Sequence, residues 1–145
     1  MMRLGEWLGL RLVGGEVIEL VGDVGAGKTT FTRGLARGLG IDSAIQSPTF
    51  TVSREYGCRD NLRLVHYDFY RLLEAGIMAD EIHDTLLDPQ AVVVVEWSGV
   101  VADVLPDRRI IFTIQPVAES ENERELVGGG AGVAILKEYK HATTA

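Results

Sequence analysis

Gly22-Asp23-Val24-Gly25-Ala26-Gly27-Lys28-Thr29 is the stretch of this 145-residue chain that decides its fold. The stretch fits the pattern G-x-x-x-x-G-K-[ST], which is typical of a phosphate-binding loop. Glycines allow a tight turn whose backbone N–H groups point at one anion, and the helix that follows adds the positive end of its dipole. The pattern predicts a phosphate site from Gly22 to Thr30, with Lys28 near the β- and γ-phosphates and the Thr29 hydroxyl on Mg²⁺.

The flanking sequence gives this loop the context that it requires, a strand before it and a helix after it. The short apolar run 17–21 predicts the strand. Phe31, Leu35 and Leu39 recur at helical spacing and Gly40 follows, which predicts a helix over 29–39. A glycine-rich turn before an ordinary surface helix is the alternative interpretation. Lysine usage argues against this alternative, because the chain has only three lysines and one of them lies in this loop.

Composition limits the remaining classes of function. The length suits one domain, and no stretch is apolar for long enough to span a membrane. A single cysteine, Cys58, excludes an internal disulfide framework and a cysteine-based zinc site, so we expect a cytoplasmic protein. The formal net charge of −7 provides no basic face for nucleic acid. Any role in a nucleic-acid pathway is therefore expected to depend on a protein partner.

Helical and strand patterns alternate along the chain. Helices are expected over 4–12 and 29–39, and one or two short helices within 71–87. Strands are expected over 17–21, 62–68, 91–96, 110–114 and 124–127. Ser47 to Val52 reads as a turn that leads into a further strand. The alternation predicts an α/β fold, a single P-loop NTPase-like domain over 1–140 with a mainly parallel sheet flanked by helices. The tail 141–145 is expected to be frayed.

Two acids stand where a nucleotide site needs them. Glu96 closes the apolar run 91–95, and a carboxylate at the carboxyl end of a buried strand lies on the ligand side of an open α/β sheet. Asp68 ends another strand, and it enters the same crevice if the two strands are parallel. These acids could hold Mg²⁺ or place the attacking water. A turn cap at Glu96 and a helix N-cap at Asp68, for a helix starting near Arg71, are the alternatives.

Five further residues remain open from pattern alone. His66 is expected to be a buried, hydrogen-bonded histidine, and Trp97 is expected to pack in the core or at an edge. Arg71 could face the γ-phosphate or pair with an acid, and Thr49 could sense the nucleotide or only form a turn. Arg124 could face either the base or the solvent.

Taken together, these segments resemble the TsaE (YjeE) family. The resemblance covers residues 4 to 127 and is carried by four stretches in a fixed order: Gly22 to Gly34, Ser47-Pro48-Thr49-Phe50-Thr51, His66-Tyr67-Asp68-Phe69-Tyr70-Arg71-Leu72 and Val94-Val95-Glu96-Trp97. The phosphate loop alone is shared by many enzymes, whereas the four stretches together are specific. The second and third stretches resemble the two switch-like segments of the family.

The resemblance implies an ATPase that binds ATP and Mg²⁺ and hydrolyses ATP slowly by itself. It implies work with TsaD and TsaB in the modification of tRNA at adenosine 37, with tRNA contacted only through the complex and the transfer itself performed by TsaD. In this comparison Lys28, Asp68 and Glu96 are catalytic, and Thr29 and Glu96 bind the metal. The family has a strand ahead of its first helix, which is expected to be missing here, and Met1 stands where the family has a threonine near the adenine.

Two other functions share the same loop. A small-molecule kinase is one alternative, although it needs an acceptor pocket and a mobile lid that a short chain has few residues to build. A non-catalytic module that senses ATP and alters affinity for a partner is the other. A GTPase is disfavoured because the sequence contains no Asn-Lys-x-Asp segment.

Overall fold

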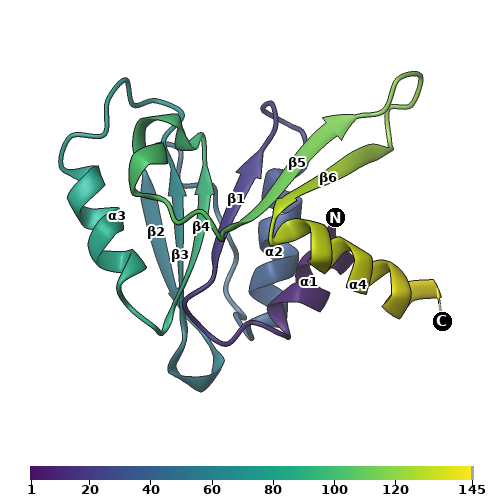
Figure 1. The fold of residues 1–145 in the computed structure, drawn as a ribbon, viewed down its shortest axis with the longest axis horizontal. Helices are drawn as coiled ribbons and strands as arrows, with labels where there is room; N and C mark the ends of the chain where they lie inside the picture. The colour runs from purple at the N-terminus through teal and green to yellow at the C-terminus, as the bar shows by residue number, and fades with distance from the viewer. Residues whose placement is uncertain (145) are drawn as a thin grey trace.

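A six-stranded sheet forms the centre of the computed structural model, which describes residues 1–144 (Figure 1). The strands lie in the order β2-β3-β4-β1-β5-β6. Their bounds are β1 (Val17–Val21), β2 (Ser53–Gly57), β3 (Arg63–Asp68), β4 (Ala91–Glu96), β5 (Ile110–Pro116) and β6 (Arg124–Gly130). The predicted strands are therefore present, and Ser47 to Val52 does lead into one of them.

The four interior strands are parallel, and both outer strands are antiparallel to their neighbours. β4 and β5 flank β1 in parallel, β3 runs parallel to β4, and β2 and β6 close the two sides. All six residues of β4 are buried, as the run of β-branched side chains predicts for a central strand. This confirms the mainly parallel sheet, and it places the carboxyl ends of β1, β3, β4 and β5 at one edge, called here the carboxyl edge.

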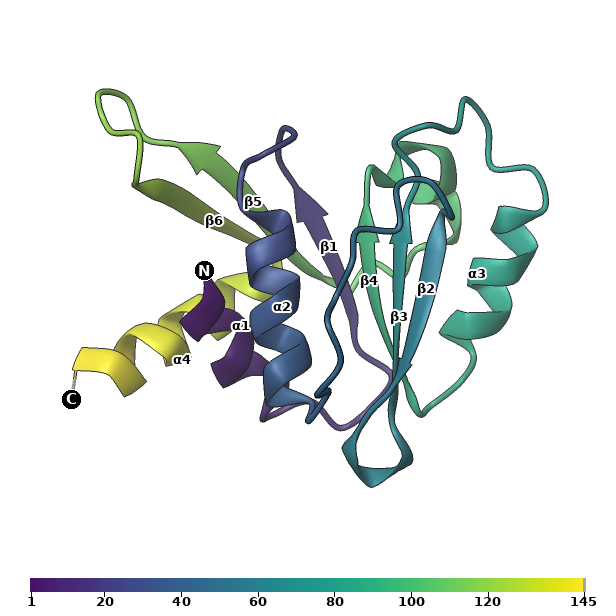
Figure 2. The ribbon, with the colours of Figure 1, turned by 180° about the vertical axis from the view of Figure 1, so that it is seen from behind.

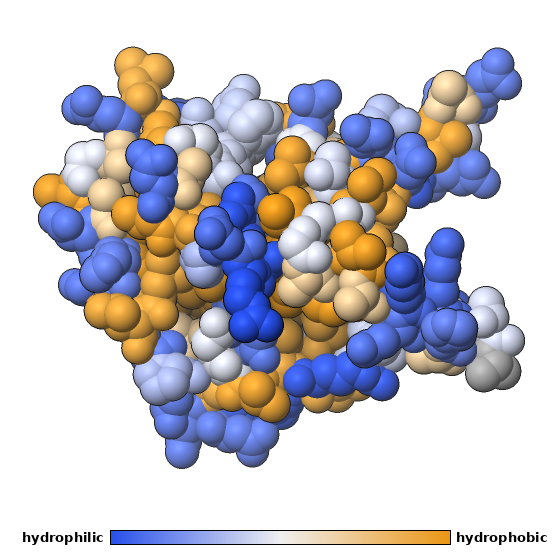
Figure 3. Space-filling view, in the orientation of Figure 1, coloured by the Kyte–Doolittle hydropathy of each residue, from blue (hydrophilic) through white to orange (hydrophobic). Residues whose placement is uncertain are grey.

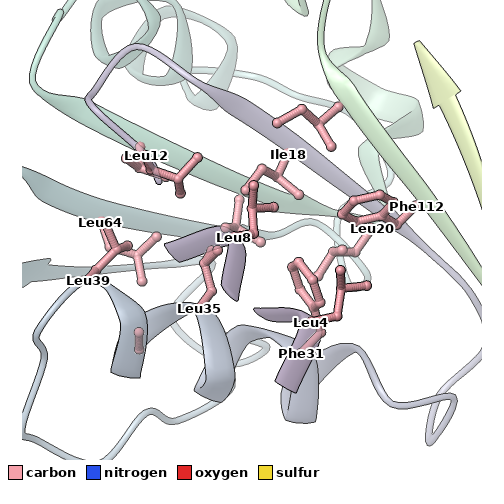
Figure 4. Close-up of a cluster of buried hydrophobic side chains, with 14 of the residues drawn as sticks. Leu4, Leu8, Leu12, Ile18, Leu20, Phe31, Leu35, Leu39, Leu64 and Phe112 are labelled. Carbon is pink, nitrogen blue, oxygen red and sulfur yellow. The ribbon is translucent and has the colours of Figure 1, made fainter. Parts of the chain in front are cut away.

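Helices cover both faces of the sheet (Figures 1 and 2). α1 (Met2–Gly9) and α2 (Lys28–Gly38) pack on one face, and α3 (Met78–Leu86) packs on the other with the 3-10 helix η2 (Ser98–Val104). Figure 4 shows how the side chains of α1 and α2 meet those of the sheet. The residues at this contact are Leu4, Leu8, Phe31, Leu35 and Leu39 from the helices and Ile18, Leu20, Leu64 and Phe112 from the strands. The core thereby fixes α2 directly beneath the phosphate loop.

α1 and α2 touch through glycine, without intervening side chains. A Cβ atom at Gly34 would overlap the carbonyl oxygen of Met2, and one at Gly5 would overlap that of Phe31. The two helix backbones are therefore closer than any larger residue would permit. The contact ties the start of the chain to the helix that begins at Lys28.

Gly34→Ala will destabilise the protein by about 1–3 kcal/mol, since the added methyl group forces the two backbones apart. Helix propensity alone favours alanine by about 1 kcal/mol, so the sign of the change tests the packing. The free energy of unfolding in urea measures it. Gly57→Ala is the matched control, because a Cβ there meets no atom within 4 Å. Equal stability of the two variants would contradict the close contact.

The sequence misplaces three features of the chain. Of the one or two short helices expected within 71–87, one is present, and it begins only at Met78, because Gly76 has a positive φ of 53° and the segment before it turns. The strand expected to end at Val127 continues to Gly130. α4 (Gly132–Thr144) is helical where a frayed tail is expected from His141, and Ala145 lies outside the described residues.

The three glycines of β6 explain how this last helix fits. A Cβ at Gly128 would lie 2.8 Å from the backbone of Gly132, so a side chain there would push α4 away from the strand. α4 then lays Tyr139 against Trp7 of α1, with ring centroids 5.4 Å apart. No helix within residues 1–144 combines the length and apolar character needed to cross a membrane.

Candidate functional site

The phosphate loop connects β1 to α2, so the predicted context of a strand and a helix is confirmed. Gly25 and Gly27 have positive φ angles of 81° and 114°, which bring the loop round to the start of α2 at Lys28. Above the helix lies a hollow of about 160 Å³, lined by Gly25, Gly27, Lys28, Thr29 and Thr30. The open N-terminus of α2 points its free N–H groups into this hollow, as an anion site requires.

Lys28 is buried and is surrounded by oxygen atoms. Its Nζ donates hydrogen bonds to the carbonyl oxygens of Gly22 and Asp23, and it lies 3.9 Å from Glu96 Oε1. It also stands 4.4 Å from the centre of the Trp97 ring. Burial lowers the pKa of Lys28, and the nearby carboxylates of Glu96, Asp68 and Asp23 offset part of that shift. The lysine predicted to reach phosphate therefore lies inside the site.

Asp68 and Glu96 are directly opposite one another on the parallel strands β3 and β4. Both side chains are buried at the carboxyl edge, so the two predicted acids lie on neighbouring strands at the same end of the sheet. Asp68 Oδ1 accepts the N–H of Tyr70, at 2.9 Å. That bond caps a turn, and the alternative of a helix N-cap is wrong because the next helix starts ten residues after Asp68, at Met78.

His66 supports Glu96 from within the sheet. The imidazole is fully buried, and its Nε2 lies 2.5 Å from Glu96 Oε2, so the prediction of a buried, hydrogen-bonded histidine is confirmed. Within residues 1–144 its Nδ1 has no hydrogen-bond partner. Because Oε1 faces Lys28 and Oε2 faces His66, both oxygens of Glu96 have defined neighbours. No pattern in the sequence indicates this contact, which joins residues 30 positions apart.

The segment Ser47 to Val52 reaches the site through Thr49. Its Oγ1 donates to Asp68 Oδ2 at 2.9 Å and lies 2.8 Å from Ser47 Oγ. Phe50, the next residue, lies under the guanidinium group of Arg71 at 4.2 Å from the ring centre. Thr49 therefore does more than form a turn. Arg71 makes no ion pair within residues 1–144, so that alternative is wrong for the described part of the chain.

Trp97 forms a wall of the site rather than part of the core. Its backbone is in the left-handed conformation, with φ 55° and ψ 53°, which is uncommon for a bulky residue. This conformation turns the ring toward Lys28 and Tyr70, whose ring centre is 4.8 Å away. A cavity of about 520 Å³ opens between these aromatic rings and the loop residues Gly22 and Asp23. The sequence predicts packing at Trp97 and misses the cavity.

Arg124 and Met1 have different positions relative to the loop. The Arg124 guanidinium group donates to the carbonyl oxygens of Glu121 and Glu123 in its own hairpin, and the side chain is exposed. Arg124 is predicted to face either the base or the solvent, and in the structure it faces the solvent. Met1 lies beside the loop, because its Cγ is 3.5 Å from where a Cβ on Gly27 would be. The position that matches the family threonine is thus next to the phosphate site.

A strand, a glycine loop and a helix, with two acids on neighbouring parallel strands, define a P-loop NTPase-like α/β domain. The sequence profile of the family described as "Threonylcarbamoyl adenosine biosynthesis protein TsaE" matches residues 1–126. The chain belongs to the TsaE family. The last turns of the fold, including α4, lie beyond the matched residues.

Curated relatives and a solved structure agree with this assignment. The TsaE protein of Bacillus subtilis is 43% identical over 128 residues, which cover 86% of this chain and 77% of the relative. That of Streptomyces coelicolor is 41% identical and covers 85% and 84%. The crystal structure of Bacillus subtilis YdiB superposes with a TM-score of 0.73 at 32% identity, covering 98% of this chain and 88% of that one. Both curated relatives are named as tRNA threonylcarbamoyladenosine biosynthesis proteins.

Proposed function

We propose that this protein binds ATP with Mg²⁺ and hydrolyses it slowly, in the cytoplasm, in support of tRNA N6-threonylcarbamoyladenosine formation with TsaB and TsaD as partners. The observation that carries the proposal is the meeting of Lys28 and Glu96, 3.9 Å apart, beside the hollow of the phosphate loop. Lys28 belongs to the loop, whereas Glu96 ends a strand and lies 68 positions later in the sequence. The names of the relatives support the pathway.

The residues present suit a magnesium nucleotide. Mg²⁺ prefers six oxygen ligands, keeps several waters and usually takes one or two protein groups besides the phosphates. Within residues 1–144 no cluster of three acids, histidines or cysteines could hold a metal unaided. The Thr29 hydroxyl and the Glu96 carboxylate would therefore hold the ion together with the triphosphate. When bound, the ion neutralises charge that develops on the β- and γ-oxygens.

The other groups of the site position the phosphates and the attacking water, and they stabilise the charge on the phosphate oxygens. The N–H groups of the loop and of the start of α2 bind the phosphates, and Lys28 balances charge on the oxygens that are transferred. Asp68 and Glu96 act as a pair that orients the attacking water, with Thr49 fixing one oxygen of Asp68 and His66 fixing one oxygen of Glu96. Little covalent chemistry falls to the protein, so this positioning accounts for the turnover.

ATP binding will change the fluorescence of Trp97 in a saturable way, because its ring touches the lysine that the phosphates engage. The measurement uses Trp7→Phe, which leaves Trp97 as the single tryptophan. Trp97→Phe is the control, since its remaining Trp7 packs against Tyr139, on α4. Equal responses from both variants would contradict the placement of the nucleotide.

Release of phosphate from ATP, with and without TsaB and TsaD, tests the activity itself. We expect slow release by the isolated chain and a change when the partners are added. The cavity of about 520 Å³ beside Asp23 gives the kinase alternative an acceptor pocket. Phosphate transfer that occurs only with a small-molecule acceptor would favour that alternative. ATP binding without any hydrolysis would favour the non-catalytic sensing module.

A further inference from the structure

Exposed apolar side chains gather at the carboxyl edge. Five of them, called here the edge patch, are Val24, Phe50, Tyr70, Leu73 and Ile77, and Leu73 is 100% exposed. They share one edge because of the topology. Val24 follows β1, Tyr70 and Leu73 follow the parallel β3, and Phe50 precedes the antiparallel β2. Figure 3 shows hydrophobic surface at the upper left, over the loop between β3 and α3.

One residue of the edge patch, Tyr70, lines a hollow that could receive a partner's side chain. The cavity of about 520 Å³ lies between Tyr70, Trp97 and the phosphate loop, and its lining also includes Phe69, Leu72 and Val100. Exposed apolar side chains that gather on one side of a protein are typical of interaction sites. Protein interfaces obtain much of their affinity from a few apolar or aromatic side chains that fill such pockets. The arrangement is therefore typical of a docking surface with a central anchor site.

The charges beside the edge patch decide which partner it fits. Glu74, Asp80 and Glu81 are exposed next to Leu73 and Ile77, and within residues 1–144 none of them has an ion-pair partner. The nearby Arg71 is held over the ring of Phe50. A second copy of this chain would bring the same acids and a net charge of −7, so charge repulsion opposes self-association. A surface with basic groups around an apolar centre is complementary.

The edge patch is also connected to the catalytic acids. Phe50 follows Thr49, whose hydroxyl donates to Asp68 Oδ2, and the N–H of Tyr70 donates to Asp68 Oδ1. Two of the three segments that carry the patch are thus bonded to one carboxylate of the site. A partner that holds these segments would fix Asp68, and a change at Asp68 would alter the surface that the partner sees.

We propose that the edge patch is the docking surface for the protein partner, and that the partner presents an apolar anchor for the cavity within a ring of Lys and Arg side chains. The inference rests on the proposed function for the identity of the partner, the TsaD–TsaB pair. It adds the surface, the chemistry of the opposing face and the connection through Asp68. The nucleotide and the partner then act on the same carboxylate.

Calorimetric titration of the full chain with the purified TsaD–TsaB pair, with ATP and Mg²⁺ present, tests the inference. Leu73→Ser/Ile77→Ser should weaken binding about 10-fold or more, as expected for interface anchors. Glu74→Lys/Asp80→Lys should weaken it as well, and the salt dependence should fall. Hydrolysis by the isolated chain should stay unchanged in both variants. Val13→Ser/Leu87→Ser is the matched control, because these residues are 78% and 70% exposed but lie outside the edge patch.

Three results would overturn the inference: wild-type affinity in the Leu73/Ile77 variant, an equal loss in the Val13/Leu87 control, or no binding by the wild-type chain. A wild-type dimer in sedimentation that the Leu73/Ile77 change dissolves would assign the patch to a second copy and also overturn it. Failure of the proposed function looks different. The pair would then bind through the edge patch while no mixture of the proteins releases phosphate from ATP.

Discussion

Lys28→Ala will lower ATP hydrolysis by about 100-fold or more, as expected when a preorganised charge beside the transferred phosphate is removed. Lys28 is the only lysine of the chain in the site, since Lys137 and Lys140 both lie on α4. Its Nζ is within hydrogen-bond distance of loop carbonyl oxygens and 3.9 Å from Glu96. Within residues 1–144 no other lysine and no arginine forms an ion pair with Glu96, so none close by can replace Lys28.

The same variant should keep its fold. Burial lowers the pKa of Lys28, which means that the folded state binds this proton less tightly than the unfolded chain does. The charged lysine therefore opposes folding, and the opposition disappears as the pH rises through the lowered pKa toward the unfolded value. Alanine removes this cost. Urea unfolding of Lys28→Ala and of the exposed control Lys140→Ala measures the outcome, and a molten Lys28 variant would show that the lysine is a structural group.

Glu96→Ala should abolish turnover, again by about 100-fold or more, while ATP still binds. The carboxylate is needed for the metal and the water, whereas the loop binds the phosphates without it. We expect the Mg²⁺ dependence of the remaining hydrolysis to weaken. Phosphate release at varied Mg²⁺ and an ATP titration of Trp97 fluorescence separate the two effects. Unchanged hydrolysis would remove Glu96 from the site.

Glu96→Gln separates the charge from the hydrogen bond. The amide can still contact His66 but carries no charge for Lys28 or Mg²⁺. Hydrolysis should therefore be lost as fully in Glu96→Gln as in Glu96→Ala, with a smaller loss of stability in the glutamine variant. Glu55→Gln, on the edge strand β2, is the control acid, because Glu55 pairs with Arg63 far from the loop. Activity in Glu96→Gln would indicate that shape matters more than charge.

The predictable part of the fold is the part in which local sequence and tertiary environment agree. The β-branched run 91–95 forms a strand because it is buried on both faces, and the loop at 22–29 turns because its glycines allow positive φ. No helix is predicted at α4, because the segment follows three glycines, which indicate the end of an element. Those glycines instead continue β6 and make room for the helix. This role depends on tertiary contacts, which local sequence patterns do not reveal.

The site divides in the same way. Asp68 and Glu96 could be placed together from the sequence, since parallel strands end at one edge and each acid closes a strand. The contacts of His66 with Glu96 and of Thr49 with Asp68 span 30 and 19 positions and depend on register and loop path. The position of Trp97 depends on a left-handed backbone conformation, which no sequence pattern predicts for a tryptophan. Local spacing carries no information about any of these three.

Because β3, β4 and β1 are interior strands, the acids and the root of the loop have a hydrogen-bonded neighbour strand on either side. Opening such strands costs nearly as much as unfolding the whole domain, whereas irregular segments open far more cheaply. The segments 47–52 and 69–77 belong to the second kind. The site thus joins interior strands that resist local opening to irregular segments that open more easily. Under the proposed function, we expect the irregular segments to make the adjustments between nucleotide states.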